Sequence, residues 1–192
     1  MTGSPDLFVL AGPNGAGKTT FFERILAPTG LDVINADRIA ALRWPGDEQR
    51  HAYAAADEAA RLRERYLADR RSFITETVFS HPSKVELVRR AAQAGYRVHL
   101  RVLMVPVDLA VARVDQRVRE GGHAVPVTKI RERHARLWEH VSDAIGLAFE
   151  SRVYDASGQR GRPFLEVARY SLGVVHREPD WPTWTPRELR ER

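Results

Sequence analysis

The sequence of 192 residues contains no cysteine, which excludes disulfide bonds, thiolate catalysis and cysteine-ligated zinc. Lysine is almost as scarce, because only three of the 30 basic residues are lysines and the others are arginines. The longest apolar stretch, residues 98–114, is interrupted by arginine, proline and aspartate, so no segment could span a bilayer. The first residues also lack the basic and apolar regions of a secretory signal peptide. We therefore expect a cytoplasmic protein without a membrane partner.

The charge balance is moderately basic, with 30 basic against 25 acidic residues and a net charge of +5. This excess either suits phosphates and nucleic acids or reflects a general bias towards arginine. Because the charge is spread along the whole chain, we favour the bias and do not expect a nucleic-acid partner. The hydrophobic content of 43% is ordinary for a globular protein, and the length corresponds to one domain.

Short apolar runs alternate with helical patterns along the chain, which predicts βαβ units and a mostly parallel sheet. The expected strands are residues 7–11, 31–35, 72–76, 98–105, 152–156 and 164–174. The expected helices are residues 18–26, 47–69, 84–94, 108–120 and 126–149. We assign residues 1–176 to one domain. Residues 177–192, rich in proline and tryptophan, form a C-terminal arm that either packs on the domain, which we favour, or docks a partner.

A glycine-rich loop follows the first expected strand and leads into a helix. It fits the pattern G-x-x-x-x-G-K-[ST], whose glycines let several backbone N–H groups face a bound polyanion. The following helix adds the positive end of its dipole. We expect ATP and Mg²⁺ here, with Lys18 reaching the β- and γ-phosphates and the Thr19 hydroxyl ligating the metal. The expected binding residues are Gly12, Pro13, Asn14, Gly15, Ala16, Gly17, Lys18, Thr19 and Thr20.

The loop and the alternating pattern together predict a P-loop NTPase fold. This α/β fold has three layers, a mostly parallel sheet of five to six strands and a helical lid. Transporter-type ATPases would need a strand ending in adjacent acids and a Ser-Gly-Gly-Gln signature, and GTPases would need Asn-Lys-x-Asp. None of these motifs is present. The remaining class is the small kinases, which phosphorylate a small molecule or a nucleic-acid end.

Polar residues follow two of the expected strands, where the acceptor of a small P-loop kinase lies. After the second strand, Asp37 could take the proton of an attacking hydroxyl or cap the next helix, and we favour catalysis. In the third strand, Glu76 interrupts an apolar run and would be costly to bury without a role. We expect Glu76 and Thr77 to contact acceptor hydroxyls or a metal-bound water. Ser80 either joins them or belongs to a turn.

Arginines of the helix over residues 108–120 are candidates for stabilising the transferred phosphoryl group. Arg113 and Arg117 are four residues apart and therefore share one helix face. Guanidinium groups neutralise charge on phosphate oxygens well, although this face could also simply be solvated. The helix ends at Gly121-Gly122, where glycines could hinge a lid. His123 would contact phosphate or acceptor, and it lacks the partners that a zinc ligand needs.

Taken together, these segments resemble the zeta-toxin family of P-loop kinases, in its small chromosomal-type branch. The resemblance covers about residues 6–156 in family order. The matching segments are residues 11–20, 35–37, 75–77 with Ser80, Gly95-Tyr96 and residues 113–126. It implies ATP-dependent phosphorylation of UDP-N-acetylglucosamine at the 3′-hydroxyl of the amino sugar, a product that poisons cell-wall precursor synthesis.

The resemblance also implies roles for particular residues. Asp37 matches the family's catalytic acid, Glu76 and Thr77 its sugar-side residues, and Arg113 its first lid arginine. Where better-known members carry a second lid arginine, this chain has His123, with Arg117 nearby. A separate small antitoxin protein, or none, stays open as a partner. Two rivals also stay open: a kinase of another acceptor (a nucleic-acid end, a dinucleotide or an antibiotic), and a nucleotide-gated binding module without transfer activity.

Overall fold

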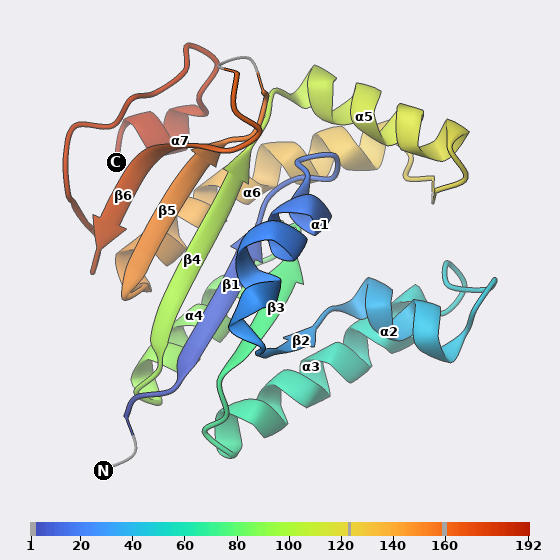
Figure 1. Cartoon of the computed structure of the whole chain (residues 1–192), viewed down its shortest axis with the longest axis horizontal. Helices are drawn as coiled ribbons and strands as arrows, with labels where there is room; N and C mark the ends of the chain where they lie inside the picture. The colour runs from blue at the N-terminus through green and yellow to red at the C-terminus, as the bar shows by residue number, and fades with distance from the viewer. Residues whose placement is uncertain (1–2, 123, 159–160) are drawn as a thin grey trace.

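The computed structural model describes residues 3–122, 124–158 and 161–192 and contains a seven-stranded sheet flanked by helices (Figure 1). The strand order is β2-β3-β1-β4-β5-β6-β7. The first five strands of this order are parallel, whereas β6 and β7 run antiparallel to their neighbours. The expected α/β P-loop fold with a mostly parallel sheet is therefore confirmed. The additional strand is a two-residue segment that turns back onto β6.

The elements follow the expected alternation with shifted boundaries. The strands are β1 (Asp6–Ala11), β2 (Asp32–Ile34), β3 (Phe73–Thr77), β4 (Arg97–Met104), β5 (Glu150–Asp155), β6 (Leu165–Ser171) and β7 (Val174–Val175). The α-helices are α1 (Lys18–Phe21), α2 (Ala36–Arg43), α3 (Ala52–Ala68), α4 (Ser83–Gln93), α5 (Val107–Arg119), α6 (Val127–Leu147) and α7 (Arg187–Arg190).

Two helical predictions need correction. The helix expected over residues 18–26 is α-helical only as far as Phe21 and continues as a π-helical turn, η1 (Phe22–Leu26). The helix expected over residues 47–69 begins later, at Ala52, and a separate helix, α2, precedes it. Trp44 leaves the helical conformation and Pro45-Gly46 follows it, which divides the two helices.

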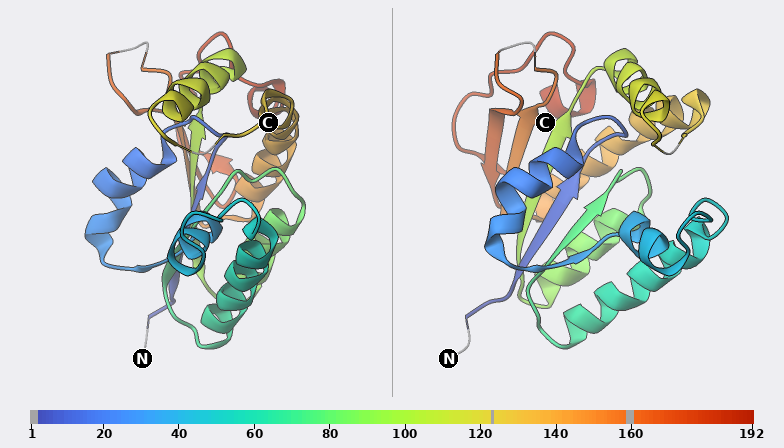
Figure 2. Two further views of the ribbon diagram at one scale, coloured as in Figure 1. Left: turned by 90° about the vertical axis from the view of Figure 1, so that its right-hand side faces the viewer. Right: turned by 45° about the vertical axis from the view of Figure 1, so that its right-hand side comes forward.

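Two apolar clusters hold the helices to the two faces of the sheet. Helices α3, α4 and α6 cover one face, where Val9, Leu100 and Leu137 are fully buried. Helix α1, its π-helical turn and α5 pack on the other face around Phe21 and Leu103. Figure 2 shows these layers edge on. Both α5 and α2 lie beside the carboxyl ends of the strands, so they flank the phosphate loop (Figure 1).

The C-terminal arm packs on the main apolar cluster. Trp181 and Trp184 are partly buried against it, and Leu189 of α7 is only 1% exposed. The backbone N–H of Asp180 donates to the Val167 carbonyl of β6 at 2.8 Å. The arm therefore completes the core beside α6 and β6. No described helix is both long and apolar enough to cross a membrane.

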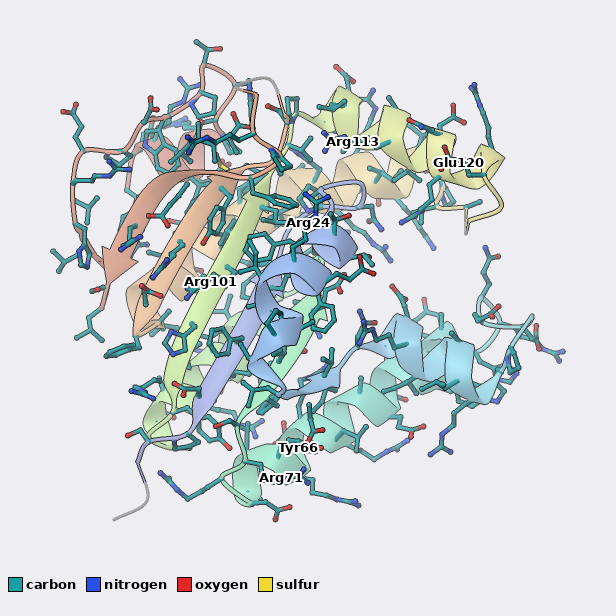
Figure 3. All side chains as sticks on the ribbon, viewed as in Figure 1. Arg24, Tyr66, Arg71, Arg101, Arg113 and Glu120 are labelled. Atoms are coloured by element: carbon teal, nitrogen blue, oxygen red, sulfur yellow. The ribbon has the colours of Figure 1, made fainter. Side chains whose placement is uncertain are left out.

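A network of charged side chains crosses β4 and β5 on the face that carries α1. Glu150 accepts hydrogen bonds from Arg101 at 2.6 Å and from Arg152 at 2.8 Å. Arg101 is buried, and Figure 3 shows it on the open part of the sheet beside α1. Burial acts to raise the pKa of Glu150, but the bonds and charges of these arginines outweigh it and lower the pKa to about 2.

Candidate active site

The phosphate loop joins β1 to α1, and its backbone demands glycine at Gly15 and Gly17. These residues have φ angles of +78° and +83°, a conformation that side chains with a Cβ rarely adopt. A Cβ on Gly15 would also lie 2.5 Å from the Ala110 carbonyl oxygen at the start of α5. The loop therefore packs closely against α5, and its curvature depends on the close contact between the backbones of Gly15 and Ala110.

Lys18 begins α1 and turns its side chain back over the loop. Its Nζ donates to the carbonyl oxygens of Gly12 at 3.0 Å and Pro13 at 3.1 Å. The ammonium thus lies inside the concave side of the loop rather than in solvent. Thr19 and Thr20 follow in the first turn of α1 and are exposed, so their hydroxyl groups are accessible to a ligand.

Four charged side chains act on the Lys18 ammonium. Burial lowers the pKa of Lys18, and the charges of Arg117 and Arg133 lower it further. The charges of Glu76 and Asp37 act in the opposite direction and raise it. Because such effects require proximity, the carboxyl ends of β2 and β3 and the helices α5 and α6 all contribute charge near the same ammonium.

Asp37 lies in the first turn of α2, just beyond the end of β2. The helix is capped by Asn35, whose Oδ1 accepts from the backbone N–H groups of Asp37 at 2.7 Å and Arg38 at 3.2 Å. Capping by Asn35 leaves the Asp37 carboxylate available, so the alternative role of Asp37 as a cap is wrong. Among the described residues, no hydrogen bond or ion pair engages this carboxylate, and the side chain is exposed.

The end of β3 supplies the other acidic group. Glu76 is half-buried beside Leu10 of β1. The Thr77 hydroxyl accepts from the backbone N–H of Phe79 at 3.1 Å and so shapes a turn in which Phe79 has a φ of +66°. Ser80 is half-buried in the same turn. These residues lie at the carboxyl edge of the sheet, where β2 also ends.

The two candidate arginines of α5, Arg113 and Arg117, are one turn apart but have different surroundings. Arg113 is half-buried, and its guanidinium donates to the carbonyl oxygens of Ala156 and Ser157 at 2.9 Å and of Gly15 at 3.3 Å. It therefore ties α5 to the phosphate loop and to the end of β5 (Figure 3). Arg117 is exposed and acts on Lys18 through its charge.

Arg133 of α6 was not among the site residues predicted from the sequence. It is half-buried and is one of the two arginines that act on Lys18. It lies three residues after Ile130 and four before Leu137, both of which are buried. The feature of the sequence that could have indicated Arg133 is a cation at a core-facing position of an amphipathic helix. His123 lies outside the described residues.

The residues present fit a nucleoside triphosphate with its metal. The loop encloses a cation, and the buried Asn14 Oδ1 has no hydrogen-bond partner in the described structure. No cluster of three or more acidic or histidine side chains in the described ranges could hold a metal ion. At a loop of this kind, Mg²⁺ would be ligated by one hydroxyl, such as that of Thr19, together with phosphate oxygens and water molecules.

The fold and this loop define a P-loop α/β domain. Residues 7–139 match the AAA domain family, and the chain belongs to that family. No curated protein matches the chain. Among solved structures, 94 chains match.

Three of these structures illustrate the likeness. The AvrRxo1-ORF1:AvrRxo1-ORF2 structure with sulphate ions has a TM-score of 0.73 and 16% identity over 98% of this chain and 63% of the matched chain. The PezAT chromosomal toxin–antitoxin system of Streptococcus pneumoniae has a TM-score of 0.63 and 15% identity over 88% and 72% of the two chains. The Pnkp1/Rnl/Hen1 RNA repair complex has 0.57 and 22% over 73% and 46%. At these identities, the likeness shows the fold alone.

Proposed function

We propose that this protein is an ATP- and Mg²⁺-dependent phosphotransferase that phosphorylates a hydroxyl group of a small molecule. The observation that supports the proposal is the combined influence of Asp37 and Glu76 on Lys18 within the phosphate loop. Two acids beside a phosphate-binding lysine suit a reaction in which a hydroxyl attacks a terminal phosphate. A module that only bound nucleotide would not need them.

Each residue has a chemical task in this proposal. Asp37 takes the proton of the acceptor hydroxyl. The hydroxyl oxygen bonds to the γ-phosphorus, while the bond from that phosphorus to the oxygen that bridges it to the β-phosphorus breaks and ADP leaves. Lys18, Arg117 and Arg133 neutralise the charge on the transferred group. Mg²⁺, when held by Thr19 and the phosphates, adds further neutralisation. Arg113 positions the loop against α5.

We propose a nucleotide sugar, and specifically UDP-N-acetylglucosamine, as the acceptor. The order of the motifs supports this choice, since it resembles the zeta-toxin family. The fold likeness to the PezAT toxin–antitoxin system is compatible with it and extends the proposal to a separate small antitoxin protein. Growth arrest on expression of the wild type, but not of Asp37→Asn, would support toxicity.

The direct test is phosphate transfer from ATP labelled at the γ-position. The panel contains nucleotide sugars, nucleosides, antibiotics and RNA 5′ ends, and mass spectrometry identifies the product. Asp37→Asn should bind ATP normally and lower kcat by at least about 100-fold, the usual contribution of a positioned acid or base. The matched control is Asp57→Asn, which alters an exposed aspartate of α3. Equal turnover in the two variants would remove Asp37 from the mechanism, and no transfer to any acceptor would refute the proposed function.

A further inference from the structure

Two cationic side chains occupy core-facing positions on adjacent helices. On α3, Arg63 lies midway between Ala59 and Leu67 at helical spacing, and both of these neighbours are buried. On α4, Lys84 lies four residues before Val88, which is fully buried. Arg63 and Lys84 are themselves half-buried. Such positions normally hold apolar residues, so the two cations are out of keeping with the pattern of their helices.

The two helices lie side by side on the same face of the sheet. An ion pair between Arg90 of α4 and Glu64 of α3 joins them, and Figure 2 shows both against the sheet. Burial lowers the pKa of Lys84, and the nearby charge of Arg63 lowers it further. Burial likewise lowers the pKa of Arg63, although the charge of the neighbouring Glu64 opposes this shift. The two groups are therefore close enough to repel each other in a partly desolvated place.

An acidic side chain offsets only one member of this pair: the charge of Glu64 raises the pKa of Arg63, whereas burial and the charge of Arg63 both lower that of Lys84. Across the described ranges, neither Arg63 nor Lys84 forms an ion pair or a side-chain hydrogen bond, and the nearby Glu64 is engaged by Arg90. Two like charges that lose solvent without a direct ion pair are unfavourable in the free protein. A bound anion would supply the counter-charge that the fold itself provides only in part.

The pair lies next to the acceptor side of the candidate site. Lys84 is four residues beyond Ser80, and its backbone N–H donates to the His81 carbonyl at 3.0 Å, at the end of the turn that follows β3. Helix α3 ends just before β3 begins, so its N-terminal end points towards the carboxyl edge of the sheet. Helical side chains lean towards the N-terminus, which directs Arg63 towards the same edge.

We propose that Arg63 and Lys84 form an anion-binding subsite that recognises a phosphate or diphosphate group carried by the acceptor. This inference rests on the proposed function and adds to it the part of the acceptor that is recognised. The guanidinium offers paired donors to phosphate oxygens, and the ammonium adds a compact charge. An uncharged acceptor, such as a free sugar, leaves the two cations unneutralised and is selected against.

The test separates this subsite from the phosphate loop, which also binds anions. The loop is first saturated with Mg²⁺ and a non-hydrolysable ATP analogue, and UDP or inorganic pyrophosphate is then titrated by calorimetry. Arg63→Gln and Lys84→Gln should each weaken binding of the probe by about tenfold or more, as expected for one charge-assisted hydrogen bond. Arg61→Gln, at an exposed position of the same helix, is the matched control and should bind as the wild type does.

A second measurement distinguishes a binding role from a structural one. Because the pair is repulsive in the free protein, Lys84→Gln should raise the urea midpoint of unfolding, whereas loss of a structural contact would lower it. The inference is overturned if neither probe binds the wild type, if both variants bind like Arg61→Gln, or if the midpoint falls in Lys84→Gln. Probe binding without phosphate transfer would refute the proposed function alone. Phosphate transfer by the wild type, together with unchanged probe binding in Arg63→Gln and Lys84→Gln, would refute the subsite but not the proposed function.

Discussion

The contact between the phosphate loop and α5 leads to a sharp prediction for Gly15→Ala. The backbone at Gly15 has a φ of +78°, and holding an alanine there costs about 1–2 kcal/mol. The added Cβ would lie 2.5 Å from the Ala110 carbonyl oxygen and 3.1 Å from the Ala110 Cα. Ala110 is fully buried, so relief requires α5 to move, at a typical overpacking cost of about 1–3 kcal/mol. The expected loss of stability is about 2–5 kcal/mol in total.

The control for this prediction is Gly30→Ala. Gly30 has a similar φ of +69°, but a Cβ there would meet nothing within 4 Å. This variant should therefore lose only the backbone contribution of about 1–2 kcal/mol. Urea unfolding gives both stabilities, and titration with ATP and Mg²⁺ gives the affinities. Gly15→Ala should also bind ATP at least about tenfold more weakly, because α5 and the loop no longer fit together. Equal stability and equal ATP affinity in the two variants would refute the reasoning.

Three further predictions follow from other contacts. Asn35→Ala removes the cap of α2 and should cost about 1 kcal/mol in urea unfolding, while unchanged stability would show that the cap is dispensable. Leu189→Ala truncates a side chain that is 1% exposed and should cost about 2–5 kcal/mol; a smaller loss would mean that the arm adds little to the core. Glu150, whose pKa is lowered to about 2 in the folded protein from 4.5, stabilises the fold above about pH 4.5, and this contribution is lost as the pH falls towards 2. The stability difference between the wild type and Glu150→Gln should therefore shrink on acidification, and a difference independent of pH would contradict the prediction.

Part of the candidate site could be predicted from residues that are neighbours in the sequence. The phosphate loop could be predicted because its glycines, Lys18 and Thr19 are contiguous and their flanking strand and helix have clear periodicity. The role of Asp37 was ambiguous in the sequence, since aspartate is both a frequent cap and a frequent base. Only the hydrogen bonds of Asn35 show which residue caps α2.

The surroundings of the arginines could not be predicted from the sequence pattern. Arg113 and Arg117 are equivalent by spacing. Carbonyl groups in the phosphate loop and just after β5 engage Arg113, whereas Arg117 acts on Lys18 through its charge. Arg133 belongs to another helix, and its charge acts on the same ammonium because α6 packs beside α5. Arg63 and Lys84 likewise become a pair only when α3 and α4 lie together.

The sequence by itself determined the parallel α/β architecture, the phosphate loop and the strand ends at which polar residues gather. These features depend on short-range periodicity and on the conformational freedom of glycine, which can be read from neighbouring residues. The tertiary structure decided which cations act on Lys18, which residue caps α2 and where two half-buried cations lie without a direct ion pair. Those facts depend on the packing of helices that are far apart in the chain, and burial and proximity of charge arise only from that packing.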